Sequence, residues 1–348
     1  MGLLASKVDF VVGVDTHKKS HTASVVEPTG AQIAQVSVTA DASGYRRVLK
    51  FGCTHAPGRR VWAIEGSGSY GSGLSTYLLE QGEWIVEVDR PVRPARRNGA
   101  KSDELDATRA AREALARKHL AQPRRRGDRE ALRVLLRTRD GAVKGRTRAI
   151  LHLKALVVTA QEGLRCHLRR SPTDEMIVRC SRLRTRAQHS VEHRATVIAL
   201  RSTARRILAL EHEANDLESH IQSIVSRLAP ELLDQTGIGP ISAAQILISW
   251  SHAGRFRSEA AFASLAGAAP IPASSGQVIR HRLNRSGDRQ LNRALYTIVL
   301  SRLGTHPETR AYAARRTAEG KSSREIKRCL KRFLARRIFK LLEHTMTT

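Results

Sequence analysis

The chain has 348 residues, of which 41% are hydrophobic, and 60 Lys and Arg against 32 Asp and Glu give it a formal charge of +28. This length can bury one or two cores, and the charge favours a polyanionic partner. No apolar run approaches about 20 residues, which excludes a membrane-spanning protein, and the four scattered cysteines fit a reduced, cytoplasmic compartment.

The charge is divided unevenly along the chain. Residues 1–120 carry 17 Lys and Arg against 13 Asp and Glu, whereas the remaining residues carry 43 against 19. This division favours an acid-bearing catalytic domain followed by a basic region that holds nucleic acid. The alternative is a ribosomal-type protein, or a composition biased toward Arg without a functional purpose, and the uneven placement disfavours it.

The first 121 residues are expected to form one α/β domain. Their hydrophobic pattern predicts three strands, then helices and strands in alternation. The expected strands are 8–14, 21–28, 31–38, 60–64 and 84–88, and the expected helices are 41–51, 73–81 and 103–118, the last one capped by Ser102. This order is typical of a sheet of the ribonuclease H type.

After the basic stretch 122–126 the sequence changes to long helical patterns, so we expect a helical, coiled-coil region over 122–229 and a mainly α-helical domain over 230–348. One segment carries apolar residues in alternating steps of three and four, typical of a heptad seam. The seam consists of Ile207, Leu210, Ala214, Leu217, Ile221, Ile224 and Leu228. Packing within the chain and self-association explain such a seam equally well; we favour self-association into a dimer or tetramer.

Two features of the last domain indicate contacts with a nucleic-acid backbone. Gly237 and Gly239 stand between two apolar helices, as in a helix-hairpin-helix, whose glycines let backbone N–H groups approach a phosphate. The final helix carries nine Lys and Arg and one acid over residues 321–340.

Four carboxylates fall where a ribonuclease H-like sheet would gather them. Asp15 ends the first strand, Glu65 ends the strand beside it, and Asp103 and Asp106 lie three apart at a helix start. Clustered carboxylates repel one another, and Mg²⁺ (or Mn²⁺) would remove that conflict because it prefers hard oxygen ligands. A helix cap and isolated surface acids are the alternative for each residue taken alone.

The stretches around these acids resemble the N-terminal domain of the DEDD transposases of bacterial insertion sequences. They are GVDTHK at 13–18, IEGSGSYGSGLSTYLLEQG at 64–82, VDRP at 88–91 and KSDELDA at 101–107. The resemblance implies a catalytic domain similar to that of Holliday-junction resolvases (RuvC-like), with Asp15, Glu65, Asp103 and Asp106 as metal ligands. It also implies DNA as the substrate and, because some members use a bridge RNA, a structured guide RNA as a partner.

A second stretch, FASLAGAAPIPASSGQVIRHRLNRSGDRQLNRALY at 262–296, resembles the C-terminal domain of the same family. The resemblance implies that Ser275 is the nucleophile and forms a phosphoserine bond to DNA, which stores the energy needed for rejoining. The residues alone do not separate Ser275 from Ser274, and without the resemblance they favour an ordinary turn in a Pro- and Gly-rich loop for both serines.

The remaining candidates are basic residues expected to contact DNA or RNA. They are Arg124, Arg125, Arg126, Arg129, Arg133, Lys144, Arg146, Arg148, Arg280, Arg282, Arg285, Arg289 and Arg293. The sequence therefore predicts an insertion-sequence transposase. Two alternatives stay open: a metal-dependent nuclease or junction resolvase that uses water, and a non-catalytic nucleic-acid-binding transposon relic.

Overall fold

The computed structural model describes residues 3–88, 103–118, 120–124, 126–272, 281–282, 284 and 287–345, and for residues 103, 104, 272, 281 and 282 it describes the backbone alone. The chain folds as two compact units, Met1–Arg125 and Arg126–Thr348. Within the described ranges, no helix combines the length and the apolar character that a membrane crossing requires.

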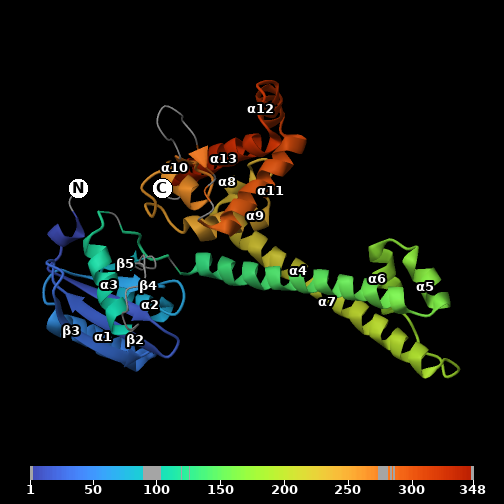
Figure 1. Cartoon of the computed structure of the whole chain (residues 1–348), viewed down its shortest axis with the longest axis horizontal. Helices are drawn as coiled ribbons and strands as arrows, with labels where there is room; N and C mark the ends of the chain where they lie inside the picture. The colour runs from blue at the N-terminus through green and yellow to red at the C-terminus, as the bar shows by residue number, and fades with distance from the viewer. Residues whose placement is uncertain are drawn as a thin grey trace. The chain divides into compact units, whose positions relative to one another are not determined.

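The N-terminal unit is built on a five-stranded sheet with the order β3-β2-β1-β4-β5 (Figure 1). Strands β1, β2 and β3 are antiparallel neighbours, whereas β4 runs parallel to β1 and β5 parallel to β4. The strands are β1 (Phe10–Thr16), β2 (Ser20–Val26), β3 (Gln32–Thr39), β4 (Arg60–Glu65) and β5 (Ile85–Val88). The helices are η1 (Leu4–Ser6), α1 (Ala42–His55), α2 (Ser72–Glu80) and α3 (Asp103–Leu115).

This arrangement confirms the expected mixed α/β class and is compatible with a ribonuclease H-like fold. The expected strands and helices of residues 1–121 are all present, with ends shifted by a few residues. Local chemistry explains several ends: the Asp41 side chain, for example, accepts hydrogen bonds from the Ser43 and Gly44 backbone N–H groups and so caps α1. The expected cap at Ser102 lies outside the described residues.

The sheet separates two apolar clusters. Val12, Val14 and Ile64 pack on one face with residues of α1 and α2. Val11 and Ala63 point to the opposite face and pack with Ala111 of α3 and its neighbours. Since β1 and β4 are covered on both faces, their side chains are almost all buried.

The second unit is helical apart from one short ladder in its described part. Its helices are α4 (Asp128–Thr159), α5 (Glu162–Arg169), α6 (Thr173–Ser181), α7 (Val191–Leu228), α8 (Pro230–Leu233), α9 (Pro240–Trp250), α10 (Glu259–Leu265), α11 (Arg289–Thr305), α12 (Pro307–Ala318) and α13 (Ser323–Thr345). The ladder pairs β6 (Ile271–Pro272) with β7 (His281–Arg282).

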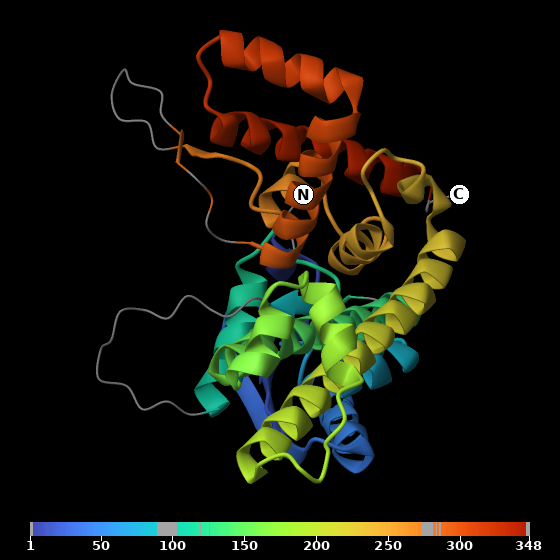
Figure 2. The same ribbon diagram turned by 90° about the vertical axis from the view of Figure 1, so that its right-hand side faces the viewer.

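Helices α4 and α7 form a long antiparallel hairpin (Figures 1 and 2). Three ion pairs join the two helices, and their partners move in opposite directions along the two helices. They are Arg139–Glu218 at 2.7 Å, Arg146–Glu211 at 2.9 Å and Arg227–Asp128 at 2.6 Å. The long helical region expected over 122–229 is therefore present, with its two main helices paired inside the chain.

The hairpin corrects one inference from the heptad seam. Ile207, Ala214 and Ile221 are buried, and the seam packs within its own chain, with Ile221 in one cluster with Leu132 and Leu136 of α4. Our preference for self-association through this seam was therefore wrong. The reason is that the second helix of the hairpin comes from residues 128–159, which sequence periodicity could not pair with it.

Two apolar clusters hold the hairpin at its ends. At one end α5 and α6 contribute Leu168, Met176 and Ile177, which pack on Leu153 and Leu200 of the hairpin. At the other end the hairpin shares its largest cluster with α8, α9, α10, α11 and α13. The expected boundary between residues 229 and 230 thus lies inside one compact unit.

Candidate active site and nucleic-acid interface

Asp15 and Glu65 lie at the ends of neighbouring parallel strands. The last paired residues of β1 and β4 in the register are Val14 and Ile64, and the two acids come directly after them. Because side chains alternate along a strand, both acids share the sheet face that Val11 and Ala63 occupy. The Asp15 side chain is only 12% exposed. The sequence prediction that these two residues are neighbours is consistent with this register.

Helix α3 crosses that same face and runs opposite to β1. Its Ala107 backbone lies against Gly13, and its Thr108 hydroxyl is 2.9 Å from the Ser24 hydroxyl of β2. Past the C-terminal end of α3, the Arg117 carbonyl accepts a hydrogen bond from the Leu4 N–H, before β1 begins. The helix therefore starts at the carboxyl end of β1 and β4, and its first turn lies at the same edge as Asp15 and Glu65.

That first turn contains Asp103 and Asp106. The Asp106 carboxylate pairs with Arg109 at 2.8 Å, and for Asp103 only the backbone is described. Among the described side chains, no three His, Cys, Asp or Glu residues stand close enough together to form a metal-binding group. The topology thus gathers Asp15, Glu65 and the start of α3 at one edge without showing a completed set of ligands.

Two residues that the sequence analysis did not select support this edge. The Thr16 hydroxyl donates to the Glu65 carbonyl at 2.8 Å and ties the end of β1 to the end of β4. The His17 Nε2 lies 3.1 Å from an Asp15 carboxylate oxygen. The stretch DTHK at 15–18 could have indicated Thr16 and His17, because residues at the end of a buried strand lie at its carboxyl edge.

The serine candidates Ser274 and Ser275 lie outside the described residues, together with Arg280 and Arg285, and the Arg282 side chain does as well. The chain on both sides of them is anchored. Ile271 pairs with Arg282 and Pro272 with His281 in an antiparallel ladder. Farther along, the Asn292 side chain donates to the Ala266 carbonyl at 2.6 Å and attaches α11 to the end of α10.

Some of the side chains predicted to contact nucleic acid are exposed, and others form ion pairs within the protein. Lys144, Arg148, Arg289 and Arg293 are exposed and remain candidates. Two more arginines form ion pairs on the hairpin, Arg133 with Glu130 and Arg146 with Glu211. Arg124 is half-buried, Arg126 is exposed, and Arg125 lies outside the described residues.

Arg129 requires a correction. Its side chain is 9% exposed, and its Nε donates to the Ile248 carbonyl of α9 at 3.1 Å, while its Nη1 contacts Glu130. A guanidinium used in this way joins the start of α4 to α9 and does not offer itself to a phosphate. Basic composition could not reveal this, because the carbonyl partner lies 119 residues away in the sequence.

The Gly237–Gly239 turn connects α8 to α9 and packs against α11. Gly237 has a φ of 82°, and a Cβ at this position would stand 3.2 Å from the Ile298 carbonyl oxygen. Buried Arg302 of α11 donates its Nε to the Thr236 carbonyl at 2.7 Å. Gly239 precedes α9 and has open space where a Cβ would be. Gly237 thus packs against α11, whereas the space beside Gly239 is open.

Comparisons with known proteins match both parts of the chain. A model of DEDD transposases of the IS110 type matches residues 12–161, and a model described as transposase IS116/IS110/IS902 family matches residues 229–314. The uncharacterized 42 kDa protein of insertion element IS900 from Mycobacterium paratuberculosis is 28% identical, over 89% of each chain. The uncharacterized 43.6 kDa protein of insertion element IS110 from Streptomyces coelicolor is 32% identical over 36% of this chain and 32% of its own.

The first match spans α4 and the sheet edge with Asp15, Glu65 and the start of α3, which we call the acidic edge. The second match spans the Gly237–Gly239 turn, the β6–β7 ladder and α11. Together with the acids at the carboxyl edge of a mixed sheet, they establish the family that the sequence motifs indicated. The chain belongs to the IS110 family of DEDD transposases.

Proposed function

We propose that this transposase cuts and rejoins DNA with Mg²⁺ (or Mn²⁺) bound at the acidic edge and with Ser275 as the nucleophile. The observation that carries the proposal is the convergence of Asp15, Glu65 and the first turn of α3 at the carboxyl end of β1 and β4. A buried carboxylate such as Asp15, beside other acids, is favoured when a cation balances its charge.

The donor set suits a hard divalent cation. Asp15, Glu65 and Asp106 offer carboxylate oxygens, and Asp103 would add a fourth carboxylate from the same first turn of α3. When bound, the cation would stabilise negative charge on the phosphodiester that is being cut. The residues of the chain would bind the strand at this edge, with Thr16 holding Glu65 beside Asp15.

The serine step is a balanced exchange of phosphate esters. The Ser275 oxygen would form a bond to phosphorus as the bond to a DNA oxygen breaks, and that oxygen would leave as a hydroxyl after taking up a proton. Attack by another DNA hydroxyl on the phosphoserine would reverse the exchange and join a new pair of ends. No external energy source is needed, because one ester replaces another.

DNA binding follows from the family, and a structured guide RNA is a further part of the proposal. The exposed Lys144 and Arg148 on α4 support phosphate contacts, while the low aromatic content of 4% disfavours binding dominated by base stacking. A dimer or tetramer stays in the proposal on the family resemblance alone, because the heptad seam is already packed within the chain.

A suicide-substrate assay tests the proposal. Purified protein, Mg²⁺, DNA of the element ends and RNA transcribed from the element flanks are incubated and resolved on denaturing gels, with and without protease. We expect a protease-sensitive protein–DNA adduct that is absent in Ser275→Ala and in Asp15→Asn but present in Ser274→Ala.

Three results would change the assignment. An adduct lost only in Ser274→Ala would move the nucleophile to Ser274. Cleavage without any adduct would indicate a nuclease that uses water. Tight binding without metal-dependent cleavage would indicate a non-catalytic relic.

A further inference from the structure

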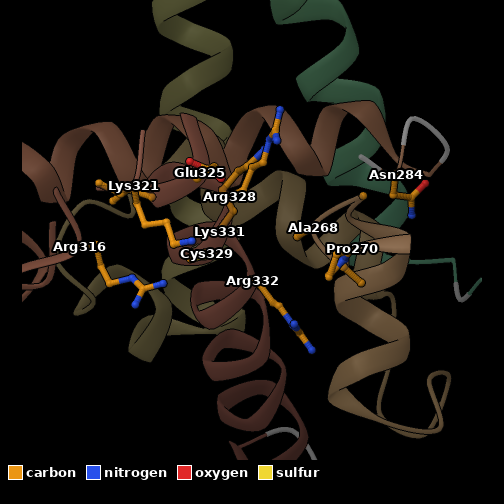
Figure 3. Close-up of a pocket in the computed structure, with 13 residues that line it drawn as sticks. Ala268, Pro270, Asn284, Arg316, Lys321, Glu325, Arg328, Cys329, Lys331 and Arg332 are labelled. Carbon is orange, nitrogen blue, oxygen red and sulfur yellow. The ribbon is translucent and has the colours of Figure 1, made fainter. Parts of the chain in front are cut away.

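A pocket of about 400 Å³ lies in the second unit between the loop after α10 and the helices α12 and α13. Figure 2 shows α12 and α13 side by side. Ala268, Pro270 and Asn284 line one side of the pocket, and five cationic residues from α12, the α12–α13 turn and α13 line the other (Figure 3). These residues are Arg316, Lys321, Arg328, Lys331 and Arg332. We call this feature the α13 pocket.

The positive charge of the α13 pocket is poorly balanced. Glu325 is the one carboxylate among the lining residues, and it is occupied by the Ser322 backbone N–H at 2.9 Å and the Ser322 hydroxyl at 2.7 Å. Arg316 pairs with Glu319. In the part of the chain that the structure describes, Lys321, Arg328 and Arg332 form no ion pair within 4.0 Å. The hydrogen bonds from Ser322 lower the pKa of Glu325, and the charges of Lys321 and Arg328 lower it further, so one carboxylate faces five cationic groups.

Lys331 is the most buried of the three cations that α13 contributes to the pocket. It is half-buried, and its Nζ donates to the Asn292 side-chain oxygen at 2.9 Å, a neutral partner. Burial lowers the pKa of Lys331, and the positive charge of Arg328 lowers it further. Arg328, Lys331 and Arg332 follow the i, i+3, i+4 spacing that places side chains on one helix face. A bound anion would relieve the repulsion among them.

The chemistry of the lining favours a nucleic-acid backbone over a base. The described lining residues include no aromatic side chain on which a base could stack. Guanidinium and ammonium groups on one helix face match phosphate oxygens, which carry no sequence information. The pocket is also close in sequence to the stretch that contains Ser274 and Ser275, since Pro270 directly precedes β6 and Asn284 comes two residues after β7.

We propose that the α13 pocket binds phosphodiester groups of a nucleic-acid strand, with Arg328 and Arg332 as the main contacts. The proposal rests on the proposed function for the identity of its ligand, a nucleic acid. It adds a backbone-binding site on α13 that holds the strand in register without reading its sequence.

Binding measurements with matched variants test the site. Arg328→Ala/Arg332→Ala removes two charges from the pocket, and Arg310→Ala/Arg324→Ala removes two exposed charges from the same helices outside it. Fluorescence anisotropy with a labelled DNA duplex and with a labelled structured RNA is recorded in EDTA over a salt series. Unfolding by urea checks that both variants stay folded.

We expect the slope of log K against log salt to become shallower by about 1.8 in the pocket variant, because each lost phosphate contact removes about 0.9. The control variant should change much less. Loss with DNA only, or with RNA only, identifies which strand occupies the pocket. Equal losses in the pocket and control variants would overturn the proposal, since they would reflect net charge alone.

Cys329 gives a second readout inside the pocket. In a Cys53→Ser/Cys166→Ser background only Cys329 and Cys180 remain, and Cys180 is buried with its pKa raised to about 11 by burial. Alkylation of Cys329 should slow in the presence of a saturating oligonucleotide. An unchanged rate at saturation would place the strand elsewhere and overturn the proposal.

These measurements separate the pocket from the catalytic proposal because they need neither metal nor cleavage. Retained phosphate binding in a protein that never cuts DNA would contradict the proposed function and leave the pocket standing. Cleavage with an adduct, combined with unchanged binding in the Arg328→Ala/Arg332→Ala variant, would support the proposed function and overturn the proposal for the pocket.

Discussion

Gly13 of β1 lies directly against the backbone of Ala107 in α3, so close that a Cβ on Gly13 would stand 2.1 Å from the Ala107 carbonyl oxygen. This contact sets how near α3 approaches the sheet. It therefore also sets where the first turn of α3, with Asp103 and Asp106, lies relative to Asp15. A glycine two residues before Asp15, a proposed metal ligand, thus has a positioning role that its small size makes possible.

Replacing Gly13 with Ala should push α3 off the sheet. We expect the free energy of unfolding to fall by about 1–3 kcal/mol, as for other overpacked cores. Metal-dependent DNA cleavage should fall further than the loss of folded protein explains. Urea unfolding and a cleavage assay on the same preparation measure both. Gly141→Ala is the control, because a Cβ meets nothing within 4 Å there and should stabilise the helix slightly. Full activity in Gly13→Ala would contradict the positioning role.

The α4–α7 hairpin predicts how the seam responds to protein concentration. Ile221→Ala removes a fully buried side chain and should destabilise the helical unit by about 2–5 kcal/mol. Since the seam packs within one chain, the melting temperature should depend on protein concentration to the same extent in Ile221→Ala and in the wild type. Calorimetry over a hundredfold concentration range tests this. A melting temperature that rises with concentration in the wild type and not in Ile221→Ala would indicate that the seam pairs between two chains.

The basic residues of α4 should separate into binding and structural groups. Lys144→Ala and Arg148→Ala should each weaken DNA or RNA binding and reduce the salt slope by about 0.9, with little change in stability. Arg129→Ala should instead lower the free energy of unfolding by about 1–3 kcal/mol, because it leaves the Ile248 carbonyl without its donor. Binding titrations at a temperature where all three variants are folded distinguish the two outcomes.

Asp41 gives the N-terminal unit a defined response to acid. Hydrogen bonds from the Ser43 side chain and then from the Gly44 backbone lower the pKa of Asp41 from 3.8 to about 2. A carboxyl with a lowered pKa in the folded state contributes stability above its unfolded pKa, and this contribution is lost as the pH falls from about 4 to about 2. Asp41→Asn keeps a capping oxygen without titrating. Its urea midpoint should fall less steeply than that of the wild type over this range, and equal slopes would contradict the capping role.

Short-range patterns in the sequence determined the elements of the N-terminal unit and the family of the chain. Short apolar runs specified the strands that carry Asp15 and Glu65 near their ends, and the spacing of Asp103 and Asp106 specified one helix turn. These signals are local, because side-chain period and capping act over a few residues. The motifs around the acids and around Ser275 are also short stretches of sequence, and they indicated the transposase family.

Only the tertiary structure decided which surfaces are free and which are already used. The heptad seam has its partner in α4, and Arg129 has its partner in the Ile248 carbonyl, more than one hundred residues away in the sequence. The α13 pocket likewise requires Pro270 and Arg328 to meet. Pairings over such distances are set by the packing of whole helices, and no local pattern encodes them. The sequence alone therefore specified the acids and the helices, whereas their packing decided which basic side chains remain available to a phosphate.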